Sequence, residues 1–156
     1  MNTTTRRLTA GVLTAAAATT IALGATGVAN AGTMPVNRPG EPTTAMTITN
    51  HTNRTEYLIG ATAGQGGRFV NAPQRELRPG VTETITAVSP FGNYLTVNAA
   101  YRIGVGGPTA NYEIENMHGN TNTAMSGVSG PRANQYWMSH NISSWYPTVN
   151  VGFQQW

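Results

Sequence analysis

From residue 45 onward the sequence is a succession of short runs in which β-branched and aromatic residues alternate with polar ones. Turn residues interrupt the runs roughly every 8–12 residues, a spacing typical of sandwiches and barrels. Strand side chains point alternately to two faces, so the alternation predicts half-buried strands. The predicted strands are residues 45–49, 56–62, 68–70, 74–77, 82–88, 94–103, 110–117, 123–128, 134–140 and 148–154. The pattern predicts an all-β fold, a single antiparallel β-sandwich of about eight to ten short strands.

Two of these runs also predict which face is buried. In the run 94–103, one face carries apolar side chains and is assigned to the core: Leu95, Val97, Ala99, Tyr101 and Ile103. In the run 110–117, Tyr112, Ile114 and Asn116 share one face, whereas Glu113 and Glu115 share the other. A one-residue shift would bury two carboxylates, so this register is expected to be strongly fixed.

The beginning of the chain has the features of an export signal. Arg6 and Arg7 precede an uncharged apolar stretch, residues 8–28, and Ala29, Asn30 and Ala31 follow in the small-x-small form of a cleavage site. This predicts a cleaved secretory signal peptide, residues 1–31, and a secreted protein. Residues 32–44 are rich in proline and glycine and form either an extended N-terminal arm or an ordered edge segment. Residues 45–156 are predicted to form the domain.

The charge and the cysteine content argue against nucleic-acid binding and against functions that depend on cysteine. The chain has nine arginines, two of them in the predicted leader, and six glutamates, so the remainder is close to neutral. No basic cluster of the kind that binds nucleic acid is present. The absence of cysteine excludes disulfides, thiolate metal sites and a cysteine nucleophile.

The sequence contains no recognisable catalytic motif. Glu113 and Glu115 are the only closely spaced acids, and two positions apart on one strand they are read as a solvated strand face rather than a glycosidase pair. His51, His118 and His140 are widely spaced and form no metal-binding motif. The chain has no aspartate and no GxSxG motif. A non-enzymatic protein without metal or cofactor is predicted.

The aromatic residues are unevenly distributed. Six of the twelve fall in the last 21 residues: Tyr136, Trp137, Trp145, Tyr146, Phe153 and Trp156. Trp137 and Phe153 lie within predicted strands and are assigned to the core. Trp145 and Tyr146 lie in a Ser/Pro turn, where they serve either packing or binding to a membrane interface or a sugar ring. The predicted ligand-binding residues are Trp145, Tyr146, Tyr136 and Trp156, with Arg132 available to pair with a phosphate.

Turn residues and strand faces over residues 45–125 follow a recognisable order. It comprises Ile48-Thr-Asn-His-Thr52, Leu58, the glycine cluster 64–67, Pro73, Leu77-Arg-Pro-Gly80, Thr82, Tyr101-Arg-Ile-Gly104 and Gly119-Asn-Thr-Asn122. This order resembles the small β-sandwich cytolysin-like proteins: aegerolysins, related bacterial crystal-toxin proteins and, more distantly, actinoporins. The resemblance implies a secreted β-sandwich that recognises membrane lipid head groups and sometimes forms pores with a partner. Phe69 stands where a tryptophan-containing strand is expected. Three prolines in residues 32–44 argue against an inserting N-terminal helix.

These observations lead to one main functional expectation and two alternatives. The main expectation is a secreted, non-enzymatic protein that recognises membrane lipid head groups or cell-surface glycans through aromatic loops. The first alternative is a protein-interaction module, such as an inhibitor or an assembly subunit, which includes a possible homo-oligomer. The second is an enzyme in which Glu113 or Glu115 meets a distant histidine in a cleft.

Overall fold

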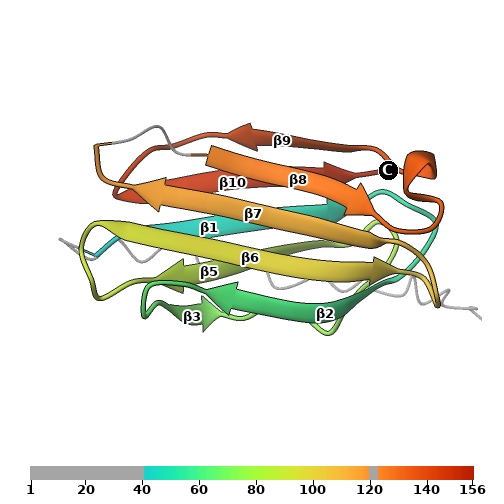
Figure 1. The fold of residues 1–156 in the computed structure, drawn as a ribbon, viewed down its shortest axis with the longest axis horizontal. Helices are drawn as coiled ribbons and strands as arrows, with labels where there is room; N and C mark the ends of the chain where they lie inside the picture. Colours follow the sequence, from blue (N-terminus) through green and yellow to red (C-terminus); the bar gives the residue numbers. More distant parts are fainter. Residues whose placement is uncertain (1–40, 120–122) are drawn as a thin grey trace, which may run out of the picture.

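The computed structural model describes residues 41–119 and 123–156, which form two β-sheets packed face to face (Figure 1). The predicted leader, most of the predicted arm and residues 120–122 of the family-like order lie outside the described residues. The strands are β1 (Thr43–Asn50), β2 (Glu56–Ala63), β3 (Arg68–Asn71), β4 (Glu76–Leu77), β5 (Thr82–Val88), β6 (Tyr94–Ile103), β7 (Thr109–Met117), β8 (Thr123–Ser129), β9 (Met138–Ile142) and β10 (Thr148–Gln155). The predicted all-β sandwich is confirmed.

Each sheet contains five strands. One has the order β3-β5-β1-β10-β9, and the other has the order β4-β2-β6-β7-β8. Neighbouring strands are antiparallel with one exception: β1 and β10 run parallel in an unbroken register from Thr43↔Thr148 to Asn50↔Gln155. The sandwich is antiparallel as predicted apart from this pair, which the sequence analysis did not anticipate. A parallel pair requires a long crossover, and here the chain between β1 and β10 supplies it.

The core lies between the two sheets, where the predicted inward faces meet. All five residues assigned to the core face of β6 are buried, as are Tyr112, Ile114 and Asn116 of β7. Phe153 of β10 is also buried, as predicted, and its ring packs edge-on against Tyr112 at 5.5 Å between centroids. Period-two alternation therefore identified the buried face of the central strands correctly.

The predicted strand 134–140 begins differently. A short 3₁₀ turn, η1 (Ala133–Gln135), occupies its first part, and β9 starts only at Met138. The left-handed backbone of Arg132, with φ of 60°, reverses the chain directly before this turn. Successive backbone bonds from Gln135 N–H to Arg132 O and from Tyr136 N–H to Ala133 O then keep the segment coiled.

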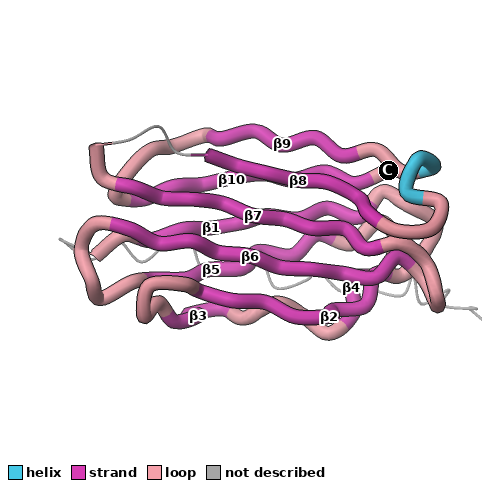
Figure 2. The backbone as a smooth tube through the Cα atoms, viewed as in Figure 1, coloured by secondary structure: helices cyan, strands magenta, loops and turns pink. Residues whose placement is uncertain are grey.

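The connecting segments gather at two opposite ends of the sandwich (Figure 2). The Trp145 end comprises the described segments 64–67, 89–93, 118–119 and 143–147. The Trp156 end comprises segments 51–55, 72–75, 78–81, 104–108 and 130–137 together with Trp156. In Figure 1 the Trp156 end carries η1 and the C mark.

Candidate functional site: two ends of the sandwich

The five predicted ligand-binding residues do not form one surface. Trp145 and Tyr146 precede β10, whereas Trp156 follows it, and Tyr136 and Arg132 lie beside η1. The eight residues of β10 separate the two groups, a span of roughly 25 Å at about 3.3 Å per residue. The structure thus places two of the predicted residues at the Trp145 end and three at the Trp156 end.

At the Trp145 end two large aromatic side chains are exposed. Trp145 is 60% exposed and Phe91 is 67% exposed. Sequence reasoning missed Phe91, although its Ser-Pro-Phe-Gly context is the same kind of signal that singled out Trp145. In the Phe91 turn the Phe91 N–H donates to Ser89 Oγ at 3.2 Å, and Asn93 N–H donates to Phe91 O at 2.8 Å.

Tyr146 serves mainly to fix this end. Its hydroxyl donates to Gly92 O at 2.5 Å, which joins segment 143–147 to segment 89–93. Its ring meets His118 edge-on at 4.8 Å, and the residue is half-buried. Asn116 Nδ2 donates to Pro147 O at 2.9 Å and to Thr43 O at 3.0 Å, and so ties the segment to β1. Trp145 therefore projects from a loop that is held in place.

The connecting segments of the Trp145 end carry no arginine or glutamate, but a glutamate precedes β1 at the same end. The described connecting segments are 64–67, 89–93, 118–119 and 143–147. Glu41 comes two residues before β1, and its neighbour Pro42 accepts a backbone bond from Ser89 N–H at 3.0 Å. Arg68 follows segment 64–67 directly and is exposed. Glu115, at the base of this end, is half-buried and accepts a hydrogen bond from the Tyr94 hydroxyl at 3.3 Å.

At the Trp156 end three rings form a ladder. His51 stacks on Trp156 at 5.0 Å between centroids and 11° between planes, and Trp137 lies on Trp156 at 4.5 Å and 31°. Backbone bonds of 2.9 Å in each direction join Trp137 and Trp156. The assignment of Trp137 to the core is therefore wrong, because the residue is 62% exposed. It lies one residue before β9 and pairs with Trp156, beyond the end of β10.

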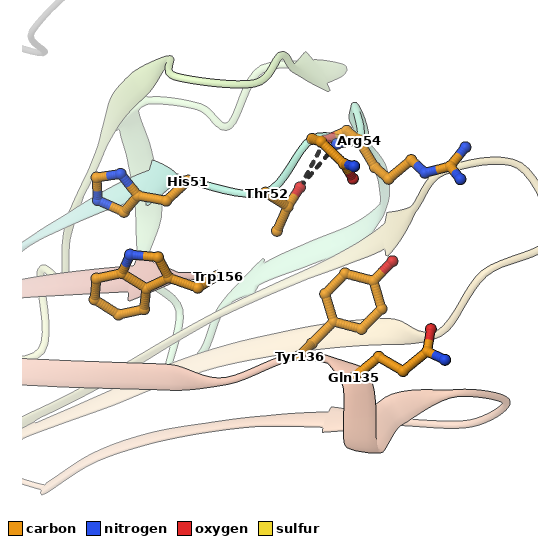
Figure 3. Close-up of a pocket in the computed structure, with 7 residues that line it drawn as sticks. His51, Thr52, Arg54, Gln135, Tyr136 and Trp156 are labelled. Atoms are coloured by element: carbon orange, nitrogen blue, oxygen red, sulfur yellow. Dashed lines mark hydrogen bonds between the residues drawn. The ribbon is translucent and has the colours of Figure 1, made fainter.

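A cavity of about 410 Å³ opens beside this ladder (Figure 3). Its lining comprises His51, Thr52, Asn53, Arg54, Gln135, Tyr136 and Trp156. Two of the predicted residues, Tyr136 and Trp156, thus border one pocket. Arg132 is exposed at the start of η1 and does not line it.

Two glutamates lie inside the sandwich near the Trp156 end, and sequence reasoning did not identify them. Glu56 accepts a hydrogen bond from the Tyr112 hydroxyl at 3.0 Å, and Glu83 accepts bonds from the Tyr101 hydroxyl and from Gln74 N–H at 2.8 Å. Both carboxyls are buried, and Glu56 Oε1 has no hydrogen-bond partner. The signal for Glu83 was its position on the same strand face as Ile85.

Burial raises the pKa of both carboxyl groups. Loss of hydration raises the pKa of Glu56 from 4.5 to about 7, opposed by the Tyr112 hydrogen bond and reinforced by the charge of Glu83. Burial also raises the pKa of Glu83 and of the Tyr101 and Tyr112 hydroxyls. These groups are enclosed in the core, so the arrangement is a structural network rather than a site open to substrate.

Glu113, Glu115 and His140 are the other candidate chemical groups. Glu113 and Glu115 lie on the outer face of β7, as predicted, and Glu113 accepts a bond from Asn98 Nδ2 at 3.1 Å. The hollow of about 170 Å³ beside Glu113 is lined by Asn111, Glu113, Met125, Ser126 and Gly127. His140 is not part of this lining, but its Nδ1 lies 3.3 Å from the Ser126 hydroxyl. Across residues 41–119 and 123–156, no group of three or more acidic, histidine or cysteine side chains could hold a metal ion.

Comparisons with known proteins do not assign the chain to a family. No family model matches the chain, and the search of curated proteins found no match. The part of the chain that the structure describes contains no helix with the length and apolar character needed to cross a membrane.

Proposed function

We propose that this protein is a secreted, non-enzymatic binding protein that attaches to the surface of a lipid bilayer through its Trp145 end. One observation supports the proposal: Phe91 and Trp145 are both largely exposed on two segments that the Tyr146–Gly92 hydrogen bond joins. The described connecting segments of this end carry no arginine or glutamate, although Glu41 precedes β1 at the same end. Tryptophan suits the bilayer interface, because its ring is apolar and its N–H remains available to water or head groups.

The energetics favour a modest, reversible attachment. Burial of a large apolar side chain stabilises association by about 1.5–3 kcal/mol, and the hydrogen-bonded loops reduce the entropy that is lost on binding. Arg68 sits at the rim of the same end, and a basic residue near an anionic surface adds about 1 kcal/mol. The affinity is therefore expected to rise when anionic lipid is added.

Single-tryptophan variants test this proposal. One variant retains Trp145 (W137F/W156F), and the matched variant retains Trp137 (W145F/W156F), which is equally exposed at the opposite end. With vesicles of phosphatidylcholine containing phosphatidylglycerol, Trp145 emission should shift to the blue and be quenched by brominated lipid, whereas Trp137 emission should not change. Equal responses of both tryptophans, or of neither, would refute attachment through the Trp145 end.

A sedimentation experiment gives an independent readout. The double variant F91A/W145A should lose co-sedimentation with the same vesicles, whereas W137A should retain it. Retention of binding by F91A/W145A would rule out these two side chains as the contact. If the unmodified protein sediments with no vesicle, the protein-interaction alternative becomes the better hypothesis, and a pull-down against surface proteins follows.

A further inference from the structure

The pocket at the Trp156 end lies outside the proposed lipid-binding surface and has its own chemistry. Two groups of its lining only donate hydrogen bonds, the Arg54 guanidinium and the Trp156 indole N–H. The side-chain amides of Asn53 and Gln135 and the Tyr136 hydroxyl both donate and accept. None of these groups makes a hydrogen bond to another described side chain or backbone atom, so all are available to a ligand. A volume of about 410 Å³ falls within the range of about 300–1,000 Å³ that is typical of small-molecule sites.

One wall of the pocket is preorganised by hydrogen bonds. Thr52 Oγ1 donates to Asn50 Oδ1 at 2.7 Å and accepts from Arg54 N–H at 3.1 Å. Asn50 Nδ2 in turn donates to Arg54 O at 2.8 Å. Since this segment is already ordered, a ligand that binds to it does not have to order the loop.

The opposite wall comes from a different part of the chain. In Figure 3 Tyr136 points toward the 51–54 segment, with Arg54 and Gln135 on one side of its hydroxyl and the His51–Trp156 stack on the other. The stack is closed by a backbone bond from His51 N–H to Gln155 O at 2.7 Å. Aromatic edges and amide groups alternating around a shallow hollow suit a hydroxylated ring better than an extended apolar chain.

The charge of the lining favours an acidic ligand. Arg54 is the only arginine in the lining, and no glutamate of the described residues lines the pocket. Glu56, the glutamate closest to Arg54 in the sequence, points into the core and is fully buried. An arginine and several neutral donors without a competing carboxylate make a favourable setting for an oxyanion.

We infer that this pocket binds a sugar ring that carries a carboxylate, such as a uronic acid residue of a surface glycan. Arg54 binds the carboxylate, and the amides of Asn53 and Gln135 together with the Tyr136 hydroxyl bind ring hydroxyls. The edge of the His51–Trp156 stack borders the apolar face of the ring.

Nuclear magnetic resonance titrations test this inference with three probes: D-glucuronate, D-glucose and inorganic phosphate. The three tryptophan indole N–H signals report by position, since Trp156 lines the pocket and Trp145 lies at the far end. Glucuronate should shift the Trp156 signal in a saturable manner and leave the Trp145 signal in place. Glucose and phosphate should each bind at least about tenfold more weakly, because each lacks either the charge or the ring.

Arginine variants identify the charge contact. Arg54→Gln should weaken glucuronate binding about tenfold, the effect of losing one charge-assisted hydrogen-bond pair. The matched control Arg132→Gln removes an arginine from the same end but outside the lining, and it should leave the affinity unchanged. Tyr136→Phe should weaken binding by a smaller factor and serves as a second variant in case Arg54→Gln alters the fold.

Each other outcome overturns the inference. Saturation by phosphate as tight as that by glucuronate would show an anion site without ring recognition. Equal losses in Arg54→Gln and Arg132→Gln would show long-range electrostatics rather than a contact. No saturable shift with glucuronate at millimolar concentration would remove the site. None of these results bears on attachment to vesicles through the Trp145 end.

Discussion

Each end of the sandwich is built around a fully buried asparagine, but the two asparagines are used differently. At the Trp156 end, Asn50 accepts from Thr52 N–H and Thr52 Oγ1 and donates to Arg54 O and Leu77 O, all within 2.9 Å. At the Trp145 end, Asn116 donates to Thr43 O and Pro147 O, but its Oδ1 has no partner. Asn50 thus defines the conformation of a loop, whereas Asn116 only joins two segments.

This difference indicates why a pocket forms at one end and projecting side chains at the other. The Asn50 network folds segment 51–54 into a wall with its side chains turned toward a neighbouring segment. The Asn116 and Tyr146 bonds instead hold two loop bases together and leave Trp145 and Phe91 largely exposed, with the Phe91 ring lying over Gly66. Comparable hydrogen-bond chemistry therefore produces a concave surface in one case and a convex one in the other.

The largest expected effect is on the Trp156 end. Asn50→Ala leaves the buried Thr52 N–H and Leu77 O without their partner, and we expect a loss of about 4 kcal/mol in the free energy of unfolding. Urea denaturation followed by circular dichroism measures this loss. Asn53→Ala, an exposed change in the same loop, should stay within about 0.5 kcal/mol. A loss below 1 kcal/mol in Asn50→Ala would contradict the view that this residue organises the wall.

The second effect is a pH dependence that originates beneath the Trp156 end. Because the folded-state pKa of Glu56 is raised from 4.5 to about 7, the folded state binds the proton more tightly than the unfolded chain. Stability is then highest below pH 4.5, falls as the pH rises to about 7 and levels off above it, with a total change of roughly 3 kcal/mol.

Denaturation midpoints at pH 5 and pH 8 measure this dependence, and Glu56→Gln isolates it. The variant should be more stable than the unmodified protein at pH 8 and should lose most of the difference between the two pH values. The remaining difference reflects Glu83, whose pKa is also raised by burial. An unchanged pH dependence in Glu56→Gln would show that another group is responsible.

The third effect tests the Trp145 end with the matching substitution. Asn116→Ala should cost about 2 kcal/mol, less than Asn50→Ala, because its Oδ1 is already unpaired and Pro147 O keeps a bond from Thr43 N–H at 2.8 Å. The same urea experiment gives the value. If Asn116→Ala lowers the free energy of unfolding by more than Asn50→Ala does, Asn116 and not Asn50 is the more important of the two buried asparagines.

The smallest effect distinguishes two tryptophans of nearly equal exposure. Trp137→Ala removes a ring stacked on Trp156 and should cost about 1 kcal/mol, as expected for an aromatic pair. Trp145→Ala should change stability by less than about 0.5 kcal/mol, because no ring contact to Trp145 is found among the described residues. Equal losses of stability in Trp137→Ala and Trp145→Ala would show that the Trp145 side chain also packs against its neighbours.

The sequence predicted the strands well where a local pattern decides the outcome. The inward face of β6 followed directly from period-two alternation, and Glu113 and Glu115 lie on the outer face of β7 as expected. Glu83 could have been assigned to the interior from the same rule. It was overlooked because a buried carboxylate needs partners, here Tyr101 and Gln74, that only the fold reveals.

The site was harder to predict because distance along the chain is not distance in space. Trp145 and Trp156 are close in sequence, yet a strand between them places them at opposite ends. His51 is more than a hundred positions from Trp156 and stacks on it, since parallel pairing brings the ends of β1 and β10 together. No local sequence pattern indicates such a pairing. Only the order of the strands in the sheet shows that the aromatic residues form two groups rather than one cluster.

The parallel pairing of β1 and β10 also has a consequence for how the chain reaches this structure. These strands are adjacent in the middle of one sheet, so β1 has only one of its two neighbours until β10 is available. Contacts between such distant segments form slowly, because a long loop must close before they yield any stabilisation. We therefore expect this sheet to assemble late and in one cooperative step, only after β10 has been synthesised.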